Sequence, residues 1–377
     1  MRIIFLNTDY PSFLRALYRR DRSLARRSYD RQMSARNASL FGTADFMSRH
    51  FRALGHDAVD IHANNRPLQE AWMEEHGQAA WTHRLKALSV LAPGKFGDYL
   101  VPVYPHDSRF WEILAAQLRA FTPDVVYNHD PSGIAVDRLK SLLPADCALV
   151  AQIAAPRDPE TAWRHYDLVV SSLPNYVASF RKDGVNAEYL PLSFESEIAQ
   201  SVKPPTRDIP LSFVGSITQA HRARAAFLET IARETEIAIW GDGVDTLPPG
   251  SAVRRRYREM AWGRDMLALL GRSQITINKH IDISEGYANN MRLFEATGMG
   301  ACLLTDWKEN LADLFEPGAE LVAYRSTEEC LDLIRYYQTH DTETARIAQA
   351  GQARCLRDHS YEKRMAELAQ ILTRRFG

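Results

Sequence analysis

Long apolar runs and an excess of charge of one sign are both missing from this sequence of 377 residues. No window approaches about 18 uninterrupted apolar residues, so we expect no membrane-spanning helix. The 46 Lys and Arg residues nearly balance the 47 Asp and Glu residues. The resulting net charge of −1 provides no overall attraction to nucleic acid or to an anionic membrane, so any basic site must be local.

Cysteine is also scarce, with four residues at Cys147, Cys302, Cys330 and Cys355. None has C-x-x-C spacing, and no histidines accompany them in a zinc pattern. Scattered cysteines with apolar neighbours are typical of reduced core residues, so we expect a cytoplasmic protein. The first residues, MRIIFLNTDY, hold only a short apolar run and predict a strand, not a signal peptide.

Repeats, low-complexity segments, the G-x-G-x-x-G fingerprint and the Walker loop are absent as well. What is present is an alternation of short apolar strands with helices, which occurs twice along the chain. The predicted strands of the first half are 2–6, 57–63, 124–128, 147–156, 166–172 and 187–193, and those of the second half are 211–215, 236–241, 274–280 and 301–306. Helical segments are predicted at 12–54, 66–98 and 108–120 and over most of the chain after 326.

This alternation predicts an α/β fold of two doubly wound, Rossmann-like domains with C-terminal helices. The polar stretch 193–210 has a Pro-Pro pair and no steady period, which indicates a linker. We therefore expect domains at 1–192 and 211–355, with a helix at 356–377 that packs back on the first domain. Ligands of such sheets bind beyond the carboxyl ends of the strands, so two facing domains predict a cleft.

The segment 284-SEGYANNMRLFEATGMGACLLTD-306 predicts a helix that leads directly into a buried strand. Asn289 or Asn290 can cap the helix, which places Arg292 in its first turn and Glu295 one turn further on the same face. A cation at a helix start is unfavourable unless an anion lies nearby, and a nucleotide diphosphate fits that need. The carboxylate can accept both ribose hydroxyls. The alternative is an internal Arg–Glu pair worth a few tenths of a kcal/mol.

Two further strand ends in the second half carry glycines. Gly215 and Ser216 follow one strand, and free N–H groups at the next helix start suit a diphosphate. Arg222 and Arg224 in that helix could add charge-assisted bonds. Gly241 ends the next strand, where a nucleotide base could lie. The alternatives are an ordinary tight turn, a solvated basic helix face and an ordinary strand exit.

These residues carry a resemblance to a known family. The region from 284 to 324 resembles the C-terminal domain of the spore-protein CgeB-like glycosyltransferases, a group with the GT-B fold. The order N-x-R-x-F-E-A…G-x-x-L-L-T-D is matched by Asn290, Arg292, Phe294, Glu295, Ala296, Gly300, Leu303, Leu304, Thr305 and Asp306. The resemblance covers residues 211–365 well and the first half only by architecture.

The resemblance implies a GT-B enzyme of the hexosyltransferase type. It implies a nucleotide-sugar co-substrate bound in the second domain, no other cofactor and no catalytic metal. The acceptor hydroxyl could belong to a glycan, a lipid-linked glycan, a protein or a small molecule. The large retaining GT-B families carry two glutamates eight positions apart, whereas here Tyr287 stands at the earlier place and Glu285 lies two residues further back. The stereochemistry therefore stays open.

An inverting transferase needs a base that takes the proton of the acceptor hydroxyl. The candidates in the first domain are Asp9, His129 and Asp130, because each follows a predicted strand. His280 in the second domain is a candidate contact for a phosphate or the acceptor. The alternatives are loop or turn residues for the first three, and a core or surface histidine for His280.

One local basic run remains, with eight arginines between positions 15 and 36. It could meet an anionic acceptor, and the alternative is a solvated helix face. We expect no nucleic-acid partner, and the oligomeric state stays open. Two other functions compete with a transferase: a sugar-nucleotide epimerase on the same fold, and a non-catalytic protein that binds a sugar nucleotide or acts as a scaffold.

Overall fold

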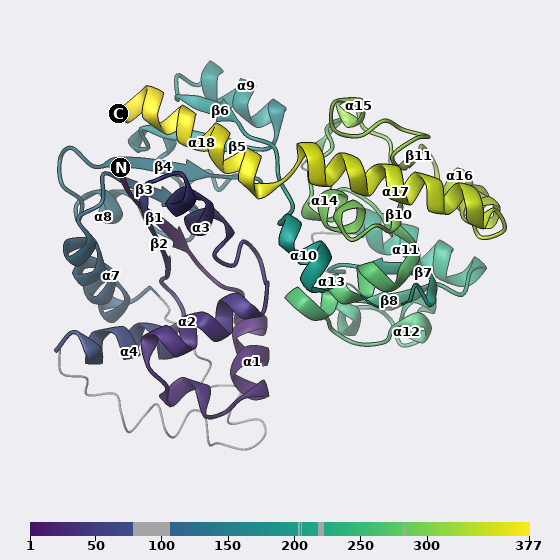
Figure 1. Cartoon of the computed structure of the whole chain (residues 1–377), viewed down its shortest axis with the longest axis horizontal. Helices are drawn as coiled ribbons and strands as arrows, with labels where there is room; N and C mark the ends of the chain where they lie inside the picture. The colour runs from purple at the N-terminus through teal and green to yellow at the C-terminus, as the bar shows by residue number, and fades with distance from the viewer. Residues whose placement is uncertain (78–105, 203, 205, 218–221, 282–283) are drawn as a thin grey trace. The chain divides into compact units, whose positions relative to one another are not determined.

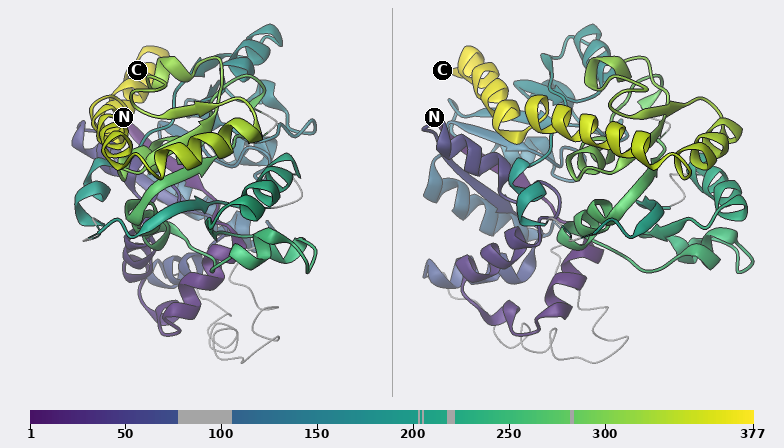
Figure 2. Two further views of the ribbon diagram at one scale, coloured as in Figure 1. Left: turned by 90° about the vertical axis from the view of Figure 1, so that its right-hand side faces the viewer. Right: turned by 45° about the vertical axis from the view of Figure 1, so that its right-hand side comes forward.

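The computed structural model describes residues 1–77, 106–202, 204, 206–217, 222–281 and 284–377. The chain forms two compact units (Figure 1). The first contains Met1–Ser171, Val177–Glu188 and Ala369–Gly377, and the second contains Ser172–Tyr176 and Tyr189–Leu368. Each unit is built around its own sheet, and Figure 2 shows both from two further directions.

The sheet of the first unit has six strands in the order β2-β1-β3-β4-β5-β6. Their bounds are β1 (Arg2–Asn7), β2 (Asp57–His62), β3 (Val125–Asn128), β4 (Ala148–Gln152), β5 (Leu168–Ser171) and β6 (Ala187–Tyr189). Strand β1 pairs in parallel with β2 on one side and with β3 on the other. The order therefore reverses between β1 and β3, and such a switch point is where doubly wound sheets bind ligands.

The helices of the first unit follow from local sequence. They are α1 (Pro11–Arg20), η1 (Leu24–Arg26), α2 (Tyr29–Ala38), α3 (Phe46–Ala53), α4 (Arg66–Glu75), α7 (Ser108–Phe121), α8 (Val136–Lys140), η2 (Trp163–His165) and α9 (Pro174–Lys182), whose first turn belongs to the second unit. The predicted helix at 108–120 is confirmed as α7. Asp107 caps this helix by accepting hydrogen bonds from the backbone N–H groups of Arg109 and Phe110. In α4, Asn65 caps the helix and a proline occupies the first turn.

The region predicted to be helical at 12–54 is mostly helical but is divided into several helices. The chain forms α1, η1, α2 and α3 with turns between them. Leu40, Gly42 and Ala44 all have positive φ, which interrupts any helix between α2 and α3. Of the region predicted at 66–98, α4 accounts for the beginning, and residues 78–98 lie outside the described part of the chain.

The sheet of the second unit has five strands in the order β11-β10-β9-β7-β8. The bounds are β7 (Ile209–Val214), β8 (Ala238–Trp240), β9 (Ser273–Asn278), β10 (Cys302–Asp306) and β11 (Val322–Tyr324). All pairs in this sheet are parallel. Its switch point falls between β7 and β9, so the loops that leave these two strands border one crevice of the unit.

The second unit holds α10 (Ser196–Ser201), α11 (Arg222–Glu234), η4 (Val244–Thr246), α12 (Ala252–Arg256), α13 (Gly263–Arg272), α14 (Met291–Gly298), α15 (Leu311–Leu314), α16 (Thr327–Tyr337) and α17 (Asp341–Asp358). Helix α18 (Tyr361–Phe376) begins in this unit and ends in the first. The core between these helices and the sheet is apolar, with Leu228, Ile231, Ile239 and Ile277 fully buried.

Two parts of the second unit differ from the sequence-based expectation. The segment 193–210 was expected to be an irregular linker, but it contains α10 and the first residues of β7. Glu195 caps α10 by accepting a bond from Glu197 N, and Ile198 is buried. Strand β11 was not predicted, because its three residues are too few to show a period.

Candidate functional site

The start of α14 is fixed to the strand before it. The Asn290 side chain accepts a hydrogen bond from Leu293 N at 3.1 Å, which confirms the predicted cap, and donates to Asn278 Oδ1 at 2.7 Å. Asn278 in turn donates to Thr305 Oγ1 at 2.9 Å. The helix therefore begins at a set position beyond the ends of β9 and β10. The neighbouring Asn289 is buried at the same point.

Arg292 and Glu295 lie one turn apart on α14, as expected. Arg292 Nη1 is 2.8 Å from Glu295 Oε2, so the internal ion pair foreseen as the alternative is present. Arg292 Nη2 also contacts Met266 Sδ at 3.2 Å. Within the described residues, however, the buried Nε atom has no hydrogen-bond partner, and Nη1 is held by the ion pair with Glu295 without an aligned hydrogen bond. Leaving a buried N–H group unpaired costs about 1–3 kcal/mol, which an added anion would offset.

The glycines after β7 and β8 bring two loops into contact. Gly241 has φ +136, and a Cβ there would lie 2.0 Å from the carbonyl oxygen of Gly215. Gly215 N donates to Trp240 O at 2.9 Å, and Ile217 N donates to Asp242 O at 2.7 Å. The close approach of the Gly215 carbonyl explains why position 241 needs a glycine, and no ligand is required for that explanation. Gly215 and the half-buried Ser216 stay at the end of β7, beside the switch point.

Arg224 ties the β7 loop to the β9 loop. Its Nη1 donates to Ser216 O at 3.0 Å, and its Nη2 and Nε donate to Lys279 O at 2.8 and 3.2 Å. The guanidinium thus positions the backbone on both sides of the switch point. Arg222 is the first residue of α11, and its side chain lies outside the described part of the chain.

His280 follows β9 and pairs with Asp306 at the end of β10. The Nδ1 of His280 lies 2.7 Å from Asp306 Oδ1, which also accepts the His280 backbone N–H at 2.9 Å. Burial would raise the pKa of Asp306, but the bonds and charge of His280 lower it to about 2. The ionised carboxylate directs Nδ1 toward itself. In the part of the chain that the structure describes, the buried Nε2 has no hydrogen-bond partner.

These side chains meet at one edge of one sheet. The exits of β7, β9 and β10 and the start of α14 all lie at the carboxyl ends of parallel strands. The edge presents a guanidinium, an imidazole and a helix N-terminus, which together suit an anion. Sequence reasoning matched Asp306 to a motif but missed its role as the partner of His280.

A second group of polar side chains occupies the switch point of the first unit. Asp9 follows β1 and is buried, with Arg36 Nη2 at 2.7 Å and His62 Nδ1 at 3.2 Å from its oxygens. Burial would raise the pKa of Asp9, but the charges of His62 and Arg36 hold it well below its usual range. A carboxylate stabilised in this way is a weaker proton acceptor than a free one.

His129 and Asp130 follow β3 at the same edge. Thr8 Oγ1 donates to Asp130 Oδ2 at 2.8 Å, and Gly133 N donates to Asp130 Oδ1 at 2.9 Å. Burial, together with the charge of His62, lowers the pKa of His129 to about 4. The fold thus brings all three candidate bases to one switch point. Arg36 and His62 were missed, although His62 also ends a strand.

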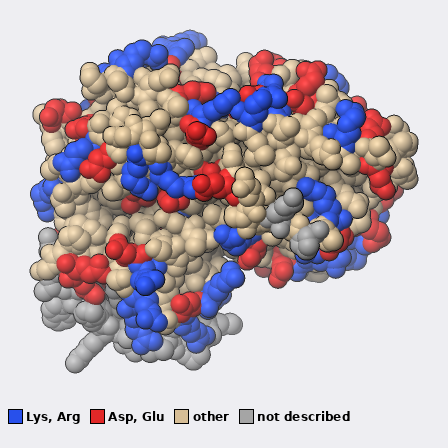
Figure 3. Space-filling view, in the orientation of Figure 1, with Lys and Arg blue, Asp and Glu red and all other residues tan. Residues whose placement is uncertain are grey.

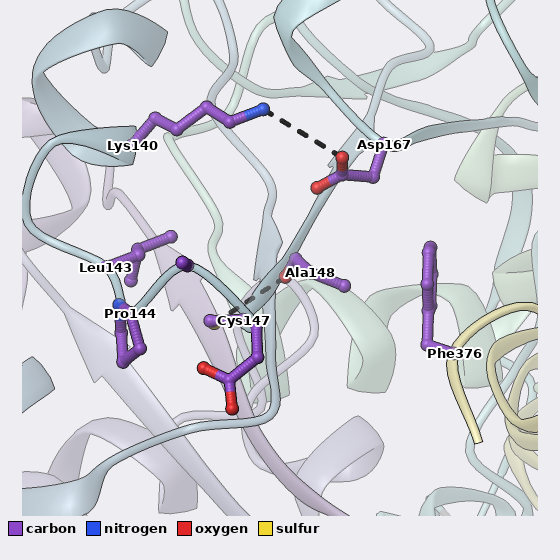
Figure 4. A pocket seen from close by; sticks show the side chains of 9 residues that line it. Lys140, Leu143, Pro144, Cys147, Ala148, Asp167 and Phe376 are labelled. Atoms are coloured by element: carbon purple, nitrogen blue, oxygen red, sulfur yellow. Dashed lines mark hydrogen bonds and ion pairs between the residues drawn. The ribbon is translucent and has the colours of Figure 1, made fainter.

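A separate cavity of about 270 Å³ lies in the first unit (Figure 4). It is bordered by Lys140, Leu143, Pro144, Ala145, Asp146, Cys147, Ala148, Asp167 and Phe376. These residues include the beginnings of β4 and β5, so the cavity lies at the opposite edge of the sheet from Asp9 and His129. Lys140 Nζ is 3.9 Å from Asp167 Oδ1, and Asp167 Oδ2 accepts from Leu149 N. Lys140 and Asp167 are therefore already engaged.

Two kinds of feature are absent from the described residues. No group of three or more His, Cys, Asp or Glu side chains there is arranged to hold a metal ion. No helix among them is long and apolar enough to cross a membrane.

Comparisons with known proteins agree with this architecture. Residues 222–370 match the family model described as "Glycosyl transferase-like". No curated protein matches the chain. The crystal structure of Anabaena Alr3699/HepE in complex with UDP and glucose is similar with a TM-score of 0.60 and 12% identity, covering 99% of this chain and 100% of that one.

Two other solved structures are similar over almost the whole chain. Sucrose-phosphate synthase from Thermosynechococcus elongatus has a TM-score of 0.56 at 10% identity, covering 100% of this chain and 99% of that one. A glycosyltransferase from Rickettsia africae has a TM-score of 0.59 at 9% identity, covering 99% and 98%. At such identities the likeness shows the fold.

The fold class is therefore that of GT-B glycosyltransferases, as predicted from the sequence. The family model adds that the region containing α14 and its strands is glycosyl transferase-like. Fold and family model together support a transferase.

Proposed function

We propose that this protein is a CgeB-like glycosyltransferase that moves a hexose from a nucleotide-sugar donor to an acceptor hydroxyl without a bound metal. The observation that carries the proposal is the state of Arg292. Its guanidinium lies in the first turn of α14. Its buried Nε has no hydrogen-bond partner among the described residues, while its Nη1 is ion-paired with Glu295. A cation at the positive end of a helix dipole is stabilised when an anion binds there.

A nucleoside diphosphate fits this position better than a simple anion does. Glu295 lies beside Arg292 and repels a lone phosphate, but its oxygens suit ribose hydroxyls. The β7 exit at Gly215 and Ser216 lies at the same edge of the sheet; Gly215 N is bonded to Trp240 O, which leaves the Ser216 N–H as the backbone group that can meet a phosphate. One ligand that combines a diphosphate with a ribose satisfies the arginine and the glutamate together.

Stabilisation of the leaving diphosphate can then come from the protein alone. Arg292, the α14 N-terminus and His280 Nε2 supply positive charge and hydrogen bonds where negative charge develops as the sugar departs. Asp306 holds the imidazole of His280 in one orientation at 2.7 Å. These groups support our proposal that no bound metal is needed for transfer.

For an inverting reaction, the acceptor proton would go to His129 or Asp130. Asp9 is the weaker of the predicted candidates, because Arg36 and His62 already stabilise its negative charge. We propose for Asp9 a positioning role within the switch point of the first unit. The acceptor is a glycan, a lipid-linked glycan, a protein or a small molecule. We place the reaction in the cytoplasm, since all four cysteines are buried and free.

The first test is a thermal-shift panel of UDP, GDP, dTDP, CDP and CMP with their sugar nucleotides. A ligand at 100 times its dissociation constant adds about 2.7 kcal/mol to the stability of the folded state. UDP and UDP-glucose head the panel, because the HepE structures hold UDP with glucose and UDP-glucose. We expect one base to stand out, and the shift to fall to about half or less in Arg292→Ala but to remain in the exposed control Arg346→Ala.

A turnover assay then separates the three functions. A transferase releases the nucleoside diphosphate faster when an acceptor is added, and EDTA leaves that rate unchanged. An epimerase changes the sugar with no acceptor present, and a scaffold protein binds without any turnover. No thermal shift with any nucleotide would remove the support for a donor site in the second unit.

A further inference from the structure

Exposed arginines gather where α1 is joined to α2 in the first unit. Residues 15–31 contain seven arginines and two aspartates, but no lysine or glutamate, in a chain whose net charge is −1. Figure 3 shows several blue side chains at the lower end of the first unit, among the blue and red groups spread over this face. The excess of positive charge is thus confined to this part of a chain that is nearly neutral overall. The proposed transfer reaction assigns no role to these arginines.

The centre of this surface, here named the arginine corner, consists of Arg22, Arg26, Arg27 and Arg31. All four residues are exposed. In the described part of the chain, none of their side chains forms a hydrogen bond or an ion pair. The nearby Asp21 accepts bonds from Ser23 N and Oγ, both at 2.8 Å, and its charge also interacts with that of Arg27, so one carboxylate offsets the four cations only in part. Four guanidinium groups therefore face solvent.

The inner side of the same corner is anchored in the core. Leu24 and Ala25 of η1 are buried, and the buried Tyr18 hydroxyl contacts Gln32 Oε1 at 2.9 Å and Asn65 Oδ1 at 2.8 Å. The backbone that carries the arginines is thus fixed, and its apolar side chains face inward. A partner of this surface is bound by charge and not by insertion of apolar side chains.

We propose that the arginine corner docks this protein on the surface of an anionic lipid bilayer. Guanidinium groups match phosphate oxygens with paired hydrogen bonds, and clusters of four to eight basic residues on one surface are typical of such docking. Single-stranded nucleic acid is less suited, since its binding relies on exposed aromatic side chains that stack on bases. Within residues 15–31, Tyr18 is buried and Tyr29 is half-buried.

The test is co-sedimentation of the full chain with lipid vesicles. We expect binding to phosphatidylcholine vesicles that contain about 30% phosphatidylglycerol, and none to pure phosphatidylcholine. Raising the salt concentration from about 0.1 M to 1 M shortens the screening length from about 10 Å to 3 Å and should release the protein. This experiment needs no nucleotide sugar, so its outcome is independent of the proposed transferase activity.

Variants then assign the binding to the corner. Each single Arg→Gln change at the four positions should lower the partition coefficient about fivefold, and the quadruple variant should bind no better than to neutral vesicles. The matched control removes the same charge from four exposed arginines of the second unit: Arg258, Arg264, Arg335 and Arg346. The control should keep at least half of the wild-type partitioning, and thermal unfolding should verify that both quadruple variants are folded.

Three results would overturn the proposal. The first is equal binding to neutral and anionic vesicles, or no binding to either. The second is an equal loss of binding in the control quadruple variant, which would make net charge the cause. The third is tighter binding to a short single-stranded RNA than to the anionic vesicles at the same salt concentration, which would assign the corner to nucleic acid.

Discussion

The guanidinium of Arg292 and the carboxylate of Glu295 are 2.8 Å apart across one turn at the start of α14. The pair keeps both side chains within reach of the same helix end. It satisfies the guanidinium of Arg292 only in part, since the buried Nε has no hydrogen-bond partner among the described residues. In a bound nucleotide, the diphosphate would contact Arg292 and the ribose hydroxyls would contact Glu295.

Arg292→Ala should therefore weaken binding of the preferred nucleoside diphosphate by about 10- to 100-fold. The basis is the loss of one charge-assisted hydrogen bond, worth about 1.5–3 kcal/mol. Binding of the corresponding nucleoside, which lacks phosphates, should change less than about threefold. Isothermal titration of both ligands measures the difference, and equal losses for both would point to a collapsed site instead of a lost phosphate contact.

Glu295→Ala should reduce the discrimination between ribose and 2′-deoxyribose. The carboxylate is expected to accept bonds from the ribose hydroxyls, so the ribonucleotide should lose roughly tenfold in affinity. The 2′-deoxy nucleotide already lacks one of these bonds and should lose less. A competition titration with both nucleotides compares the two losses. The same loss for both would mean that Glu295 acts only by holding Arg292.

Much of the fold could be predicted because the strands of both sheets are short apolar runs that end in polar loops. Ile3, Ile4, Phe5 and Leu6 are all completely buried, as a parallel strand covered on both faces requires. The cap at Asn290 was also predictable, since capping depends on residues only three positions apart. Contacts that depend on local sequence are therefore well predicted.

Contacts between distant residues were not predictable in the same way. His62 pairs with Asp9 across 53 positions, and Arg36 reaches Asp9 from a helix. Nothing in the local pattern distinguishes Arg36 from the exposed arginines of the same run, although Arg36 alone is buried. The sheet order decides which strand ends meet, and that order is a tertiary property. Arg224 shows the same limit, because its partners belong to two different loops.

Asp306→Asn should destabilise the protein at neutral pH. The pKa of Asp306 is lowered to about 2 from an ordinary value near 3.8. A carboxyl group with a lowered pKa stabilises the folded state above its unfolded pKa, and that contribution is lost as the pH falls toward 2. We expect a loss of about 2 kcal/mol at pH 7 that shrinks between pH 4 and pH 2.

Urea unfolding at pH 7, 4 and 3 measures the difference between the wild type and Asp306→Asn. The exposed Asp341→Asn serves as the control and should change the stability by less than about 0.5 kcal/mol at each pH. A difference for Asp306→Asn that stays constant with pH would show that the charge of Asp306 is not involved.

Arg36→Met should be strongly destabilising, by about 3–5 kcal/mol. It leaves the buried carboxylate of Asp9 with only His62 as a charged partner. Combining it with Asp9→Asn should recover part of that loss, because the uncompensated charge is removed. The exposed pair Arg335–Asp332 is the control, and its disruption should cost less than about 1 kcal/mol. Thermal unfolding of the single and double variants measures the coupling free energy between Arg36 and Asp9. Additive losses of stability would contradict this coupling.

His129 should make the protein less stable as the pH falls from 6.5 to 4. Burial, with the charge of His62, lowers its pKa to about 4 from an ordinary value of 6.5. The unfolded chain therefore binds a proton in this window that the folded chain does not bind, so unfolding is favoured as the pH falls. Because the residue as a whole is half-buried, we expect His129 to account for about 1–2 kcal/mol of the loss.

His129→Phe tests this, because a phenyl ring can keep the contacts with Phe5 and Tyr127, whose ring centroids lie 6.4 and 5.0 Å away. Its stability should fall less than that of the wild type between pH 6.5 and 4.5. The same low pKa bears on catalysis: if His129 is the base, the wild-type rate should stay level from pH 8 to pH 5, since the imidazole remains neutral throughout. A rate that falls with a midpoint near 6.5 would place the essential proton on a different histidine.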